Sequence, residues 1–277
     1  MKNKIDLVPL LYRLVFVPTC ASCGERLPPI VDTNQFNHGI PCLCDKCMEK
    51  WQSAKVQMCH TCYKPAGKCS CMPLKNTFAQ PSIPSVFFYH PDEKHAESKV
   101  IYSMKHKKNR DLFSFLALEL EPSLRETLDI LDISVCDCIF TYIPRTKSAL
   151  KENGFDQGKY LAKHLCKTVG GQCMLPLLIR EGGKEQKRLS KSERKSNVES
   201  AIFANSSMRG FGSKKNADGL NALLSGKTVI LVDDIITTGA SLSRAIKVLR
   251  KCGAKNVIVC AVARSEISKN KSMHNKK

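Results

Sequence analysis

The chain lacks any long run of apolar residues. No apolar stretch approaches the ~20 residues that a helix needs to cross a bilayer. The apolar segment Ile5–Val17 contains Arg13 and is followed at once by cysteines, which favours an amphipathic helix over a signal peptide. We therefore expect no membrane-spanning segment and a cytoplasmic location.

Aromatic and acidic residues are also scarce. Aromatic residues make up 6% of the chain, which leaves few rings on which nucleic-acid bases can stack. The 25 Asp and Glu residues face 44 Lys and Arg residues, giving a formal net charge of +19. This excess favours polyanionic partners, namely nucleic acid, phosphorylated metabolites or an anionic membrane. The alternative is a solvated basic surface without a partner.

Two glycine-rich nucleotide-binding signatures are missing. The chain contains neither Gly-x-Gly-x-x-Gly nor Gly-x4-Gly-Lys-Ser/Thr, so neither a dinucleotide site nor a P-loop triphosphate site is supported. A hydrophobic content of 43% and a charged content of 25% are ordinary for a globular protein. The 277 residues are sufficient for one sizeable core and a small additional module.

Cysteine, in contrast, is abundant and unevenly placed. Nine of the 15 cysteines fall between Cys20 and Cys71, and the other six are scattered from Cys136 to Cys260. Clustered cysteines in a reducing compartment indicate metal binding, because disulfides are disfavoured there. The scattered cysteines are expected to be small core residues.

Eight of the clustered cysteines form four close pairs. Two pairs can place four thiolates around one tetrahedral zinc ion, and the only alternative is a set of unligated thiols. Cys42 is a spare cysteine that is free or exchanges with Cys44, and His38 and His60 are expected bystanders. We predict two structural Zn²⁺ ions, held by Cys20, Cys23, Cys44 and Cys47 and by Cys59, Cys62, Cys69 and Cys71.

The chain divides into three parts by composition. Residues 1–80 are expected to form an N-terminal helix and a double zinc ribbon, without a long periodic segment in 18–80. After a linker at 81–84, residues 85–265 alternate strand-like and helix-like segments, which predicts an α/β parallel sheet. Residues 266–277 are expected to be a disordered basic tail, and 180–215 a polar mobile loop with a short strand at 201–204. The expected strands are 86–89, 138–143, 228–232 and 257–263, and the helices are 94–104, 112–121, 160–168 and 242–251.

One segment carries the pattern of a phosphate site. A hydrophobic strand, Thr228–Val232, leads through Asp233 and Asp234 to a small-residue loop and then a helix. Ligands of open α/β sheets bind at the carboxyl ends of strands. Successive backbone N–H groups and the helix N-terminus suit an anion, and a glycine permits close approach. The predicted phosphate-binding residues are Thr237, Thr238, Gly239, Ala240 and Ser241.

The two carboxylates do not suit a phosphate, which they would repel. They suit hydroxyl groups, such as a ribose diol, or a metal ion. Alone, a strand followed by Asp233 and Asp234 also fits a nucleotide-hydrolase metal site, and Thr-Thr-Gly alone fits a helix cap. Together, in this order, they predict a site for a 5-phosphorylated ribose of phosphoribosyl-pyrophosphate type.

The segment 232–241, Val-Asp-Asp-Ile-Ile-Thr-Thr-Gly-Ala-Ser, resembles the signature of type I phosphoribosyltransferases. With the double cysteine cluster in front, the chain resembles the ComF family of competence-associated proteins over roughly residues 5–265. Pro144 and Gly154-Phe155-Asp156-Gln157 are similar to that family's Pro…Gly-Phe-Asn-Gln segment, with Asp156 in place of the usual Asn. Asn153 and Lys187 also depart from the family pattern. Further matches are Gln186, Leu189, Glu193, Arg194, Asn197, Ala201 and Phe203.

The resemblance implies roles for these residues. Asp233 and Asp234 would be the catalytic pair that binds the ribose 2′- and 3′-hydroxyls, and residues 237–241 would hold the 5′-phosphate. Arg145 and Lys147 would meet the pyrophosphate, with Mg²⁺ bridging pyrophosphate and ribose oxygens. The implied partners are phosphoribosyl pyrophosphate, single-stranded DNA and competence proteins.

Three functions remain open at this point. The first is a ComF-type role in natural transformation, with a phosphoribosyl-pyrophosphate-binding domain that also contacts single-stranded DNA. The second is a metabolic phosphoribosyltransferase acting on an unidentified base or amine, and the third is a non-catalytic descendant. Basic clusters at Lys105–Arg110 and Lys184–Lys195 discriminate between ligands. If these clusters face the phosphate loop, we expect them to bind a small ligand. If they line one outer face of the protein, we expect them to bind a polyanion.

Overall fold

The centre of the molecule is a five-stranded parallel sheet. The computed structural model describes residues 17–28, 42–71, 80–90, 95–181, 202–205 and 217–266. Within these residues the strand order is β1-β7-β6-β2-β3, and every neighbouring pair is parallel. The predicted α/β parallel sheet is therefore confirmed. The strands are β1 (Phe87–Phe88), β2 (Cys138–Tyr142), β3 (Cys173–Met174), β6 (Thr228–Ile236) and β7 (Asn256–Arg264).

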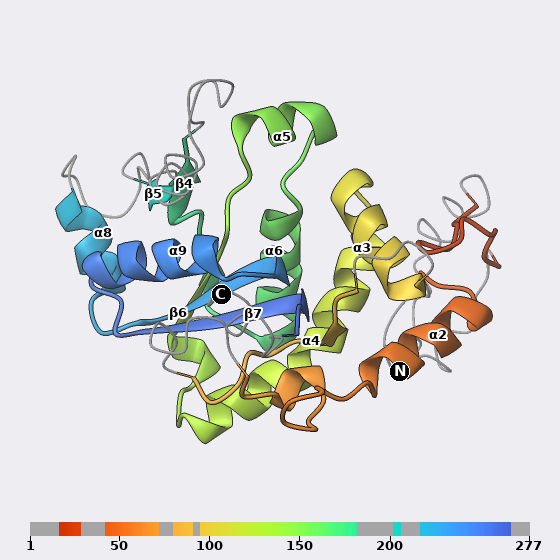
Figure 1. Cartoon of the computed structure of the whole chain (residues 1–277). Helices are drawn as coiled ribbons and strands as arrows, with labels where there is room; N and C mark the ends of the chain where they lie inside the picture. The colour runs from red at the N-terminus through yellow and green to blue at the C-terminus, as the bar shows by residue number, and fades with distance from the viewer. Residues whose placement is uncertain are drawn as a thin grey trace, which may run out of the picture.

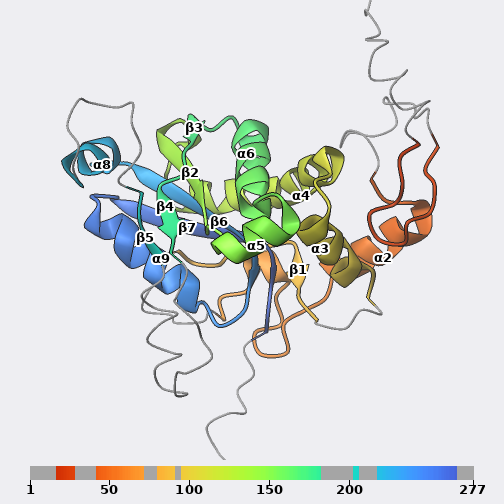
Figure 2. The same cartoon turned by 90° about the horizontal axis from the view of Figure 1, so that it is seen from above.

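Helices cover both faces of this sheet. The layer on one face contains α4 and α6, and the layer on the other contains α8 and α9 (Figures 1 and 2). A separate antiparallel pair, β4 and β5, lies next to α9. The helices are α2 (Asp45–Lys55), α3 (Ala96–His106), α4 (Arg110–Ile130), α5 (Lys147–Asn153), α6 (Gln157–Val169), α8 (Ala217–Leu224) and α9 (Ala240–Lys251), and the strand pair is β4 (Leu178–Arg180) with β5 (Ile202–Ala204).

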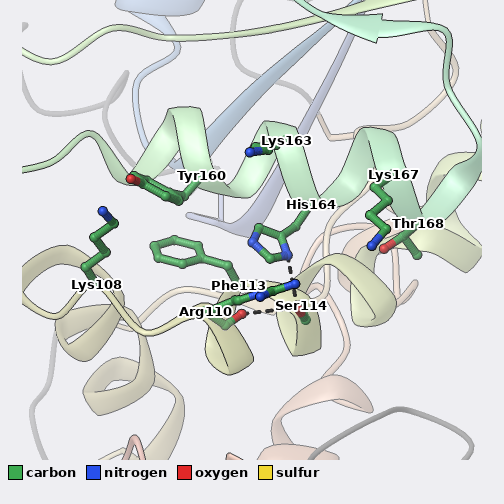
Figure 3. A pocket seen from close by; sticks show the side chains of 9 residues that line it. All are labelled: Lys108, Arg110, Phe113, Ser114, Tyr160, Lys163, His164, Lys167 and Thr168. Atoms are coloured by element: carbon green, nitrogen blue, oxygen red, sulfur yellow. Dashed lines mark hydrogen bonds between the residues drawn. The ribbon is translucent and has the colours of Figure 1, made fainter. Parts of the chain in front are cut away.

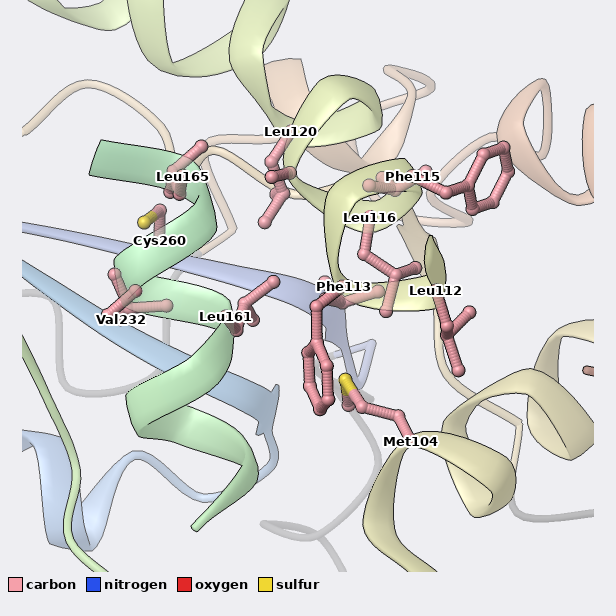
Figure 4. Packing of buried hydrophobic residues seen from close by; sticks show 14 of the residues in the cluster. Met104, Leu112, Phe113, Phe115, Leu116, Leu120, Leu161, Leu165, Val232 and Cys260 are labelled. Atoms are coloured by element: carbon pink, nitrogen blue, oxygen red, sulfur yellow. The ribbon is translucent and has the colours of Figure 1, made fainter. Parts of the chain in front are cut away.

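The central strand β6 divides the core into two clusters. Its side chains alternate between faces, as in any strand. Ile230 and Val232 pack among the residues of α4 and α6, whereas Val229 and Leu231 pack with those of α9. Figure 4 shows Val232 beside the leucines of α6, which in turn meet the apolar side of α4. Burial on both faces explains why the strand reads as a continuous apolar run.

Two predicted elements run several residues past their expected ends. The strand predicted to end at Val232 runs on to Ile236, because its backbone continues to pair with β7 as far as Arg264. The helix predicted for 112–121 runs to Ile130 and contains Pro122. Proline usually ends or kinks a helix, but here buried residues beyond it, including Leu124, extend the apolar face. Packing therefore outweighs the one backbone hydrogen bond that proline removes.

The cysteine-rich region contains a helix that its sequence did not reveal. Cys47, Trp51 and Ala54 form the buried side of α2. The Trp51 ring lies 5.1 Å from the ring of Phe87 and 5.3 Å from that of Phe115. Through this side chain the cysteine-rich region shares the core of the sheet and its helices.

The segment expected to be a linker, 81–84, is packed against the sheet. Ile83 is fully buried, and Ala261 of β7 donates a backbone hydrogen bond to Pro84. The Gln80 side chain pairs with both backbone groups of Val259, at 2.6 and 2.8 Å. The segment that we expected to be a linker therefore runs alongside β7 and pairs with it.

Other expectations meet the structure only in part. The predicted strand at 201–204 is present as β5. Of the scattered cysteines, Cys138, Cys166 and Cys260 are buried core residues as expected, whereas Cys136 is exposed. The helix expected at 5–17, most of the 180–215 loop and the tail beyond 266 lie outside the described residues. Among the residues that are described, no helix combines the length and apolar character needed to cross a membrane.

Candidate functional site

The loop after β6 forms a small hollow at the carboxyl edge of the sheet. Asp233 and residues 235–242 line a cavity of about 80 Å³. Gly239 has a φ of 74°, a left-handed conformation that glycine adopts without a steric penalty. It caps α9, whose first backbone N–H groups have no carbonyl partners within the helix. The predicted phosphate residues 237–241 are thus brought together around one anion-sized hollow.

The acidic pair is fixed by hydrogen bonds. Asp233 Oδ1 accepts a hydrogen bond from the Asp234 backbone N–H at 2.9 Å. Asp234 Oδ1 accepts from the backbone N–H of Ile235 at 2.7 Å, and its Oδ2 accepts from Gln157 Nε2 at 2.9 Å. Lys105 Nζ of α3 lies 3.7 Å from the same Oδ2. Three elements, β6, α6 and α3, therefore orient the Asp234 carboxylate.

Asp233 is electrostatically strained in the absence of a ligand. Burial raises the pKa of Asp233 well above its usual range, and the negative charge of the adjacent Asp234 raises it further. The guanidinium of Arg180 acts in the opposite direction but does not offset burial. Hydroxyl donors or a divalent cation at this carboxylate would favour its ionised form. The pair is therefore suited to bind a diol or to help hold Mg²⁺.

The loop after β2 reaches the same edge of the sheet. The Ile143 backbone N–H donates to Val232, which brings this loop beside the end of β6. Asp156 is buried; its Oδ2 accepts from the Arg145 backbone N–H at 3.0 Å, and its Oδ1 accepts from that of Lys159 at 3.3 Å. One carboxylate thus caps α6 and anchors the loop, which gives a structural role to the residue that departs from the family pattern.

The two basic residues predicted on this loop differ in position. Arg145 is half-buried, and its Nη1 lies 3.5 Å from the carbonyl of Lys105, the residue that approaches Asp234. Lys147 is the first residue of α5 and is exposed. The structure therefore connects Arg145 to the acidic pair and leaves Lys147 at the rim.

Sequence reasoning did not assign three residues of this site. Gln157 was quoted only for the resemblance, and Lys105 only as part of a basic cluster. Arg180, at the end of β4, had no sequence signal. Its Nη2 donates to Ser241 Oγ at 3.2 Å, and its Nε is buried without a partner among the described residues. Burial lowers the pKa of Arg180, and Asp233 acts to raise it.

The first cysteine cluster has the geometry of a four-thiolate metal site. The sulfur atoms of Cys20, Cys23, Cys44 and Cys47 all lie within 4.8 Å of one another. Cys23 and Cys44 Sγ are 3.7 Å apart, and a tetrahedron with 2.3 Å zinc–sulfur bonds has edges of about 3.8 Å. Burial opposes ionisation of Cys20, but backbone N–H groups, first that of Cys23, lower its pKa to about 7. Cys42 is buried outside this set of four.

The second cluster fits a metal ion in the same way. Its sulfur atoms also lie within 4.8 Å of one another, with Cys62 and Cys69 Sγ 3.5 Å apart. Arg264, buried at the end of β7, donates to the backbone carbonyls of Cys69 and Cys71. His60 is outside the cluster and pairs instead with Glu266, with 2.6 Å between Nδ1 and Oε2. The members of this cluster are Cys59, Cys62, Cys69 and Cys71.

Comparison with known proteins relates part of the chain to phosphoribosyl transferases. Residues 159–277 match the phosphoribosyl transferase domain, a range that includes the acidic pair and the phosphate loop but not the cysteine clusters. An orotate phosphoribosyltransferase from Nocardioides sp. is 36% identical over 66 residues, 24% of this chain and 36% of that protein. An adenine phosphoribosyltransferase from Rhodopseudomonas palustris is 44% identical over 52 residues, 19% of this chain and 29% of that protein. The chain thus spans about a third of each relative's length.

Solved structures show a distant likeness. Glutamine phosphoribosylpyrophosphate amidotransferase from B. subtilis, complexed with ADP and GMP, is 18% identical with a TM-score of 0.33, covering 57% of this chain and 30% of that one. Phosphoribosylpyrophosphate synthetase from Mycobacterium smegmatis is 19% identical with a TM-score of 0.30, covering 53% and 33%. The family match and the parallel sheet together identify a fold of phosphoribosyl transferase type.

Proposed function

We propose that this protein binds phosphoribosyl pyrophosphate together with Mg²⁺ and transfers its phosphoribosyl group to an acceptor. The observation that carries the proposal is the direct junction of an anion-sized loop with a fixed pair of carboxylates at the end of β6. The domain match over this segment supports the same assignment.

The geometry suggests a role for each group. The 5-phosphate would accept hydrogen bonds from the backbone N–H groups of residues 237–241, with Arg180 beside Ser241. The ribose hydroxyls would donate to Asp233 and Asp234. Mg²⁺, when bound, supplies positive charge that stabilises the departing pyrophosphate. Arg145 would add to that stabilisation, because its loop is anchored at the same edge of the sheet.

A calorimetric titration tests this proposal. Phosphoribosyl pyrophosphate with Mg²⁺ should give measurable heat with the wild-type protein, and Asp233→Ala combined with Asp234→Ala should lose most of the affinity. A loss of at least tenfold corresponds to about 1.4 kcal/mol. The matched control is Asp129→Ala with Asp137→Ala, two exposed positions away from the loop. Absence of heat with the wild-type protein at millimolar ligand would contradict the proposal.

A second candidate function is the handling of single-stranded DNA during natural transformation, as the resemblance to the ComF family implies. The position of the first basic cluster supports it, because that cluster is divided. Lys105 approaches Asp234, whereas Lys108 and Arg110 line a separate groove. The metabolic alternative is tested by product formation from phosphoribosyl pyrophosphate and a base or amine. Product without any DNA binding would favour it.

Zinc is the metal we propose for both cysteine clusters. Each cluster supplies four thiolates, which fill the tetrahedral coordination of one zinc ion, as is typical of structural zinc sites. The same argument assigns no catalytic role to either cluster. Metal analysis of the folded protein should therefore find close to two zinc ions per chain.

A further inference from the structure

A basic groove lies between α4 and α6, apart from the phosphate loop. Its volume is about 690 Å³. Four cationic side chains line it: Lys108 just before α4, Arg110 at its first residue, and Lys163 and Lys167 on α6. Figure 3 shows them around the groove, with the rings of neighbouring residues between them. None of its described lining residues is acidic.

This arrangement of charge is unfavourable without an anionic partner. Lys163 and Lys167 are four residues apart on one helix, a spacing at which like charges destabilise the helix. Asp111, next to Arg110, is an acidic residue whose charge reaches His164. The described lining residues themselves contribute four cations and no carboxylate, so the groove presents a positive potential to solvent.

Aromatic rings form the floor of the groove. The ring of Phe113 lies 5.6 Å from that of Tyr160 and 6.2 Å from that of His164, with interplanar angles of 30° and 28°. Lys108 Nζ lies 4.9 Å above the ring of Tyr160. His164 Nδ1 lies 2.9 Å from Ser114 Oγ. Burial lowers the pKa of His164, so this residue contributes an aromatic ring to the groove but little positive charge at neutral pH. Tyr160 and His164 are half-buried, whereas Phe113 is buried.

We propose that this groove binds single-stranded DNA, with its phosphates on the four cations and one base stacked on Tyr160. The assignment rests on the DNA-handling candidate function and places the strand on the molecule. A stacked base would displace the ammonium group of Lys108 from the ring and free it to pair with a phosphate. Stacking on aromatic rings between basic side chains is the usual way in which proteins hold single strands.

The spread of the cations favours a strand over a single phosphate. Tyr160 and Lys167 are seven residues apart on α6, about 10 Å along the helix axis. Arg110 and Lys108 line the opposite wall from α4 and the turn before it. Cations on both walls of the groove, spread over this length, can each pair with one of several consecutive phosphates of a strand. The bases of a single strand, unlike those of a duplex, are free to stack between them.

The groove is also adjacent to the phosphate site. Gln157, which holds Asp234, is one helical turn before Tyr160 on α6. Lys105 lies in the last turn of α3, and Lys108 follows two residues after the end of that helix. A strand in the groove would therefore lie beside the phosphoribosyl site without occupying its loop.

The test is a fluorescence-anisotropy titration of the full chain with a labelled oligothymidylate over a salt series. Lys163→Gln with Lys167→Gln should weaken binding by about tenfold or more and should flatten the log–log salt dependence by about 1.4, since each phosphate contact contributes about 0.7. The matched control is Lys247→Gln with Lys251→Gln. This exposed pair has the same spacing on α9, across the sheet, and should leave both quantities unchanged.

A second pair of variants tests the stacking ring. Tyr160→Leu should weaken strand binding by about tenfold, because an aliphatic side chain cannot stack. Tyr160→Phe keeps the ring and should bind like the wild type. Thermal unfolding of each variant establishes that it is folded. The heat of phosphoribosyl pyrophosphate binding should be the same in all of them.

The possible outcomes distinguish a failure of the proposed groove from a failure of the DNA-handling function. Wild-type protein that binds no oligothymidylate at low salt would overturn both the DNA-handling function and this groove. Binding that both lysine double variants weaken equally, or that neither weakens, would overturn the groove alone. Thymidine monophosphate that binds as tightly as the strand would replace the strand with a free nucleotide. Oligothymidylate binding that is weakened in the α6 double variant and in Tyr160→Leu, but not in their controls, supports the proposal.

Discussion

At the scale of single residues, the proposed phosphoribosyl site combines residues that the local sequence reveals with residues that only folding brings together. Asp233, Asp234 and residues 237–241 were predicted because their roles follow from a strand, a pair of carboxylates and a loop that are contiguous. Lys105 and Arg180 are far away in sequence and reach the site through α3 and β4. No spacing pattern links them to the loop, so sequence reasoning could not place them there.

Ionised Asp233 should lower the free energy of unfolding of the ligand-free protein. Its pKa in the folded state is raised above the ordinary value of 3.8, so ionisation is less favourable after folding. The penalty is fully present at pH values above the folded pKa and disappears as the pH falls toward 3.8. Asp233→Asn should therefore stabilise the protein at neutral pH by on the order of 1 kcal/mol and weaken phosphoribosyl pyrophosphate binding.

Thermal unfolding of Asp233→Asn and wild type across a pH series checks this prediction. The asparagine Oδ1 can still accept the hydrogen bond from the Asp234 backbone, so the change isolates the charge. Asp129→Asn, at an exposed position of α4, is the control and should leave the melting temperature unchanged. A lower melting temperature for Asp233→Asn, or a gain that persists near pH 4, would contradict the explanation.

At the scale of elements, the apolar patterns predicted most helices and strands, and the failures have identifiable causes. The helix α2 was missed because its buried side consists of only three residues, one of them a cysteine attributed to metal binding. The segment 81–84 looked like a linker because of its prolines, although Ile83 and Gln80 anchor it to β7. In both cases contacts with distant elements, rather than local propensity, determine the structure.

The strand pair β4 and β5 has a predicted role in phosphate binding through Arg180. The Nε of this buried guanidinium has no partner among the described residues, and its Nη2 already reaches the loop at Ser241. A phosphate in the loop can complete its hydrogen bonding. Arg180→Gln should therefore weaken binding of ribose 5-phosphate by about tenfold or more, because hydrogen bonds between charged groups are strong.

Calorimetry with separate fragments of the ligand measures this effect. Ribose 5-phosphate should lose affinity for Arg180→Gln, while pyrophosphate with Mg²⁺ should bind as it does to the wild type. Arg250→Gln, an exposed arginine at the end of α9, controls for the loss of one positive charge. Equal losses for both fragments would show that Arg180 does not distinguish the 5-phosphate.

At the scale of the whole molecule, the cysteine clusters are joined to the sheet at two separate points. The first is joined through α2, whose Trp51 is buried between Phe87 and Phe115 and donates to Glu119 at 2.9 Å. The second is joined through Arg264 of β7, which donates to two backbone carbonyls of that cluster. The cysteine-rich region therefore contributes to the same core as the phosphoribosyl transferase-type domain.

Removal of the metal ions should consequently destabilise the whole chain. Binding of structural zinc contributes about 10–16 kcal/mol in small zinc-finger peptides, whereas whole domains are stable by about 5–15 kcal/mol. A chelator strong enough to strip both clusters should abolish the cooperative unfolding transition. Trp51 is the only tryptophan of the chain and is fully buried, so its emission should shift to the red as the metal leaves.

Variants in each cluster separate the two contributions. Cys20→Ser with Cys23→Ser, and Cys59→Ser with Cys62→Ser, should each lower the metal content from about two ions per chain to about one. The first pair should expose Trp51 at a lower temperature than in the wild type, because Cys44 of that cluster is the N-cap residue of α2. The second should destabilise the end of β7, since the carbonyls that satisfy buried Arg264 belong to that cluster. Folded wild-type protein that contains no metal, or metal-stripped protein whose Trp51 emission is unchanged, would show that the clusters do not support the core.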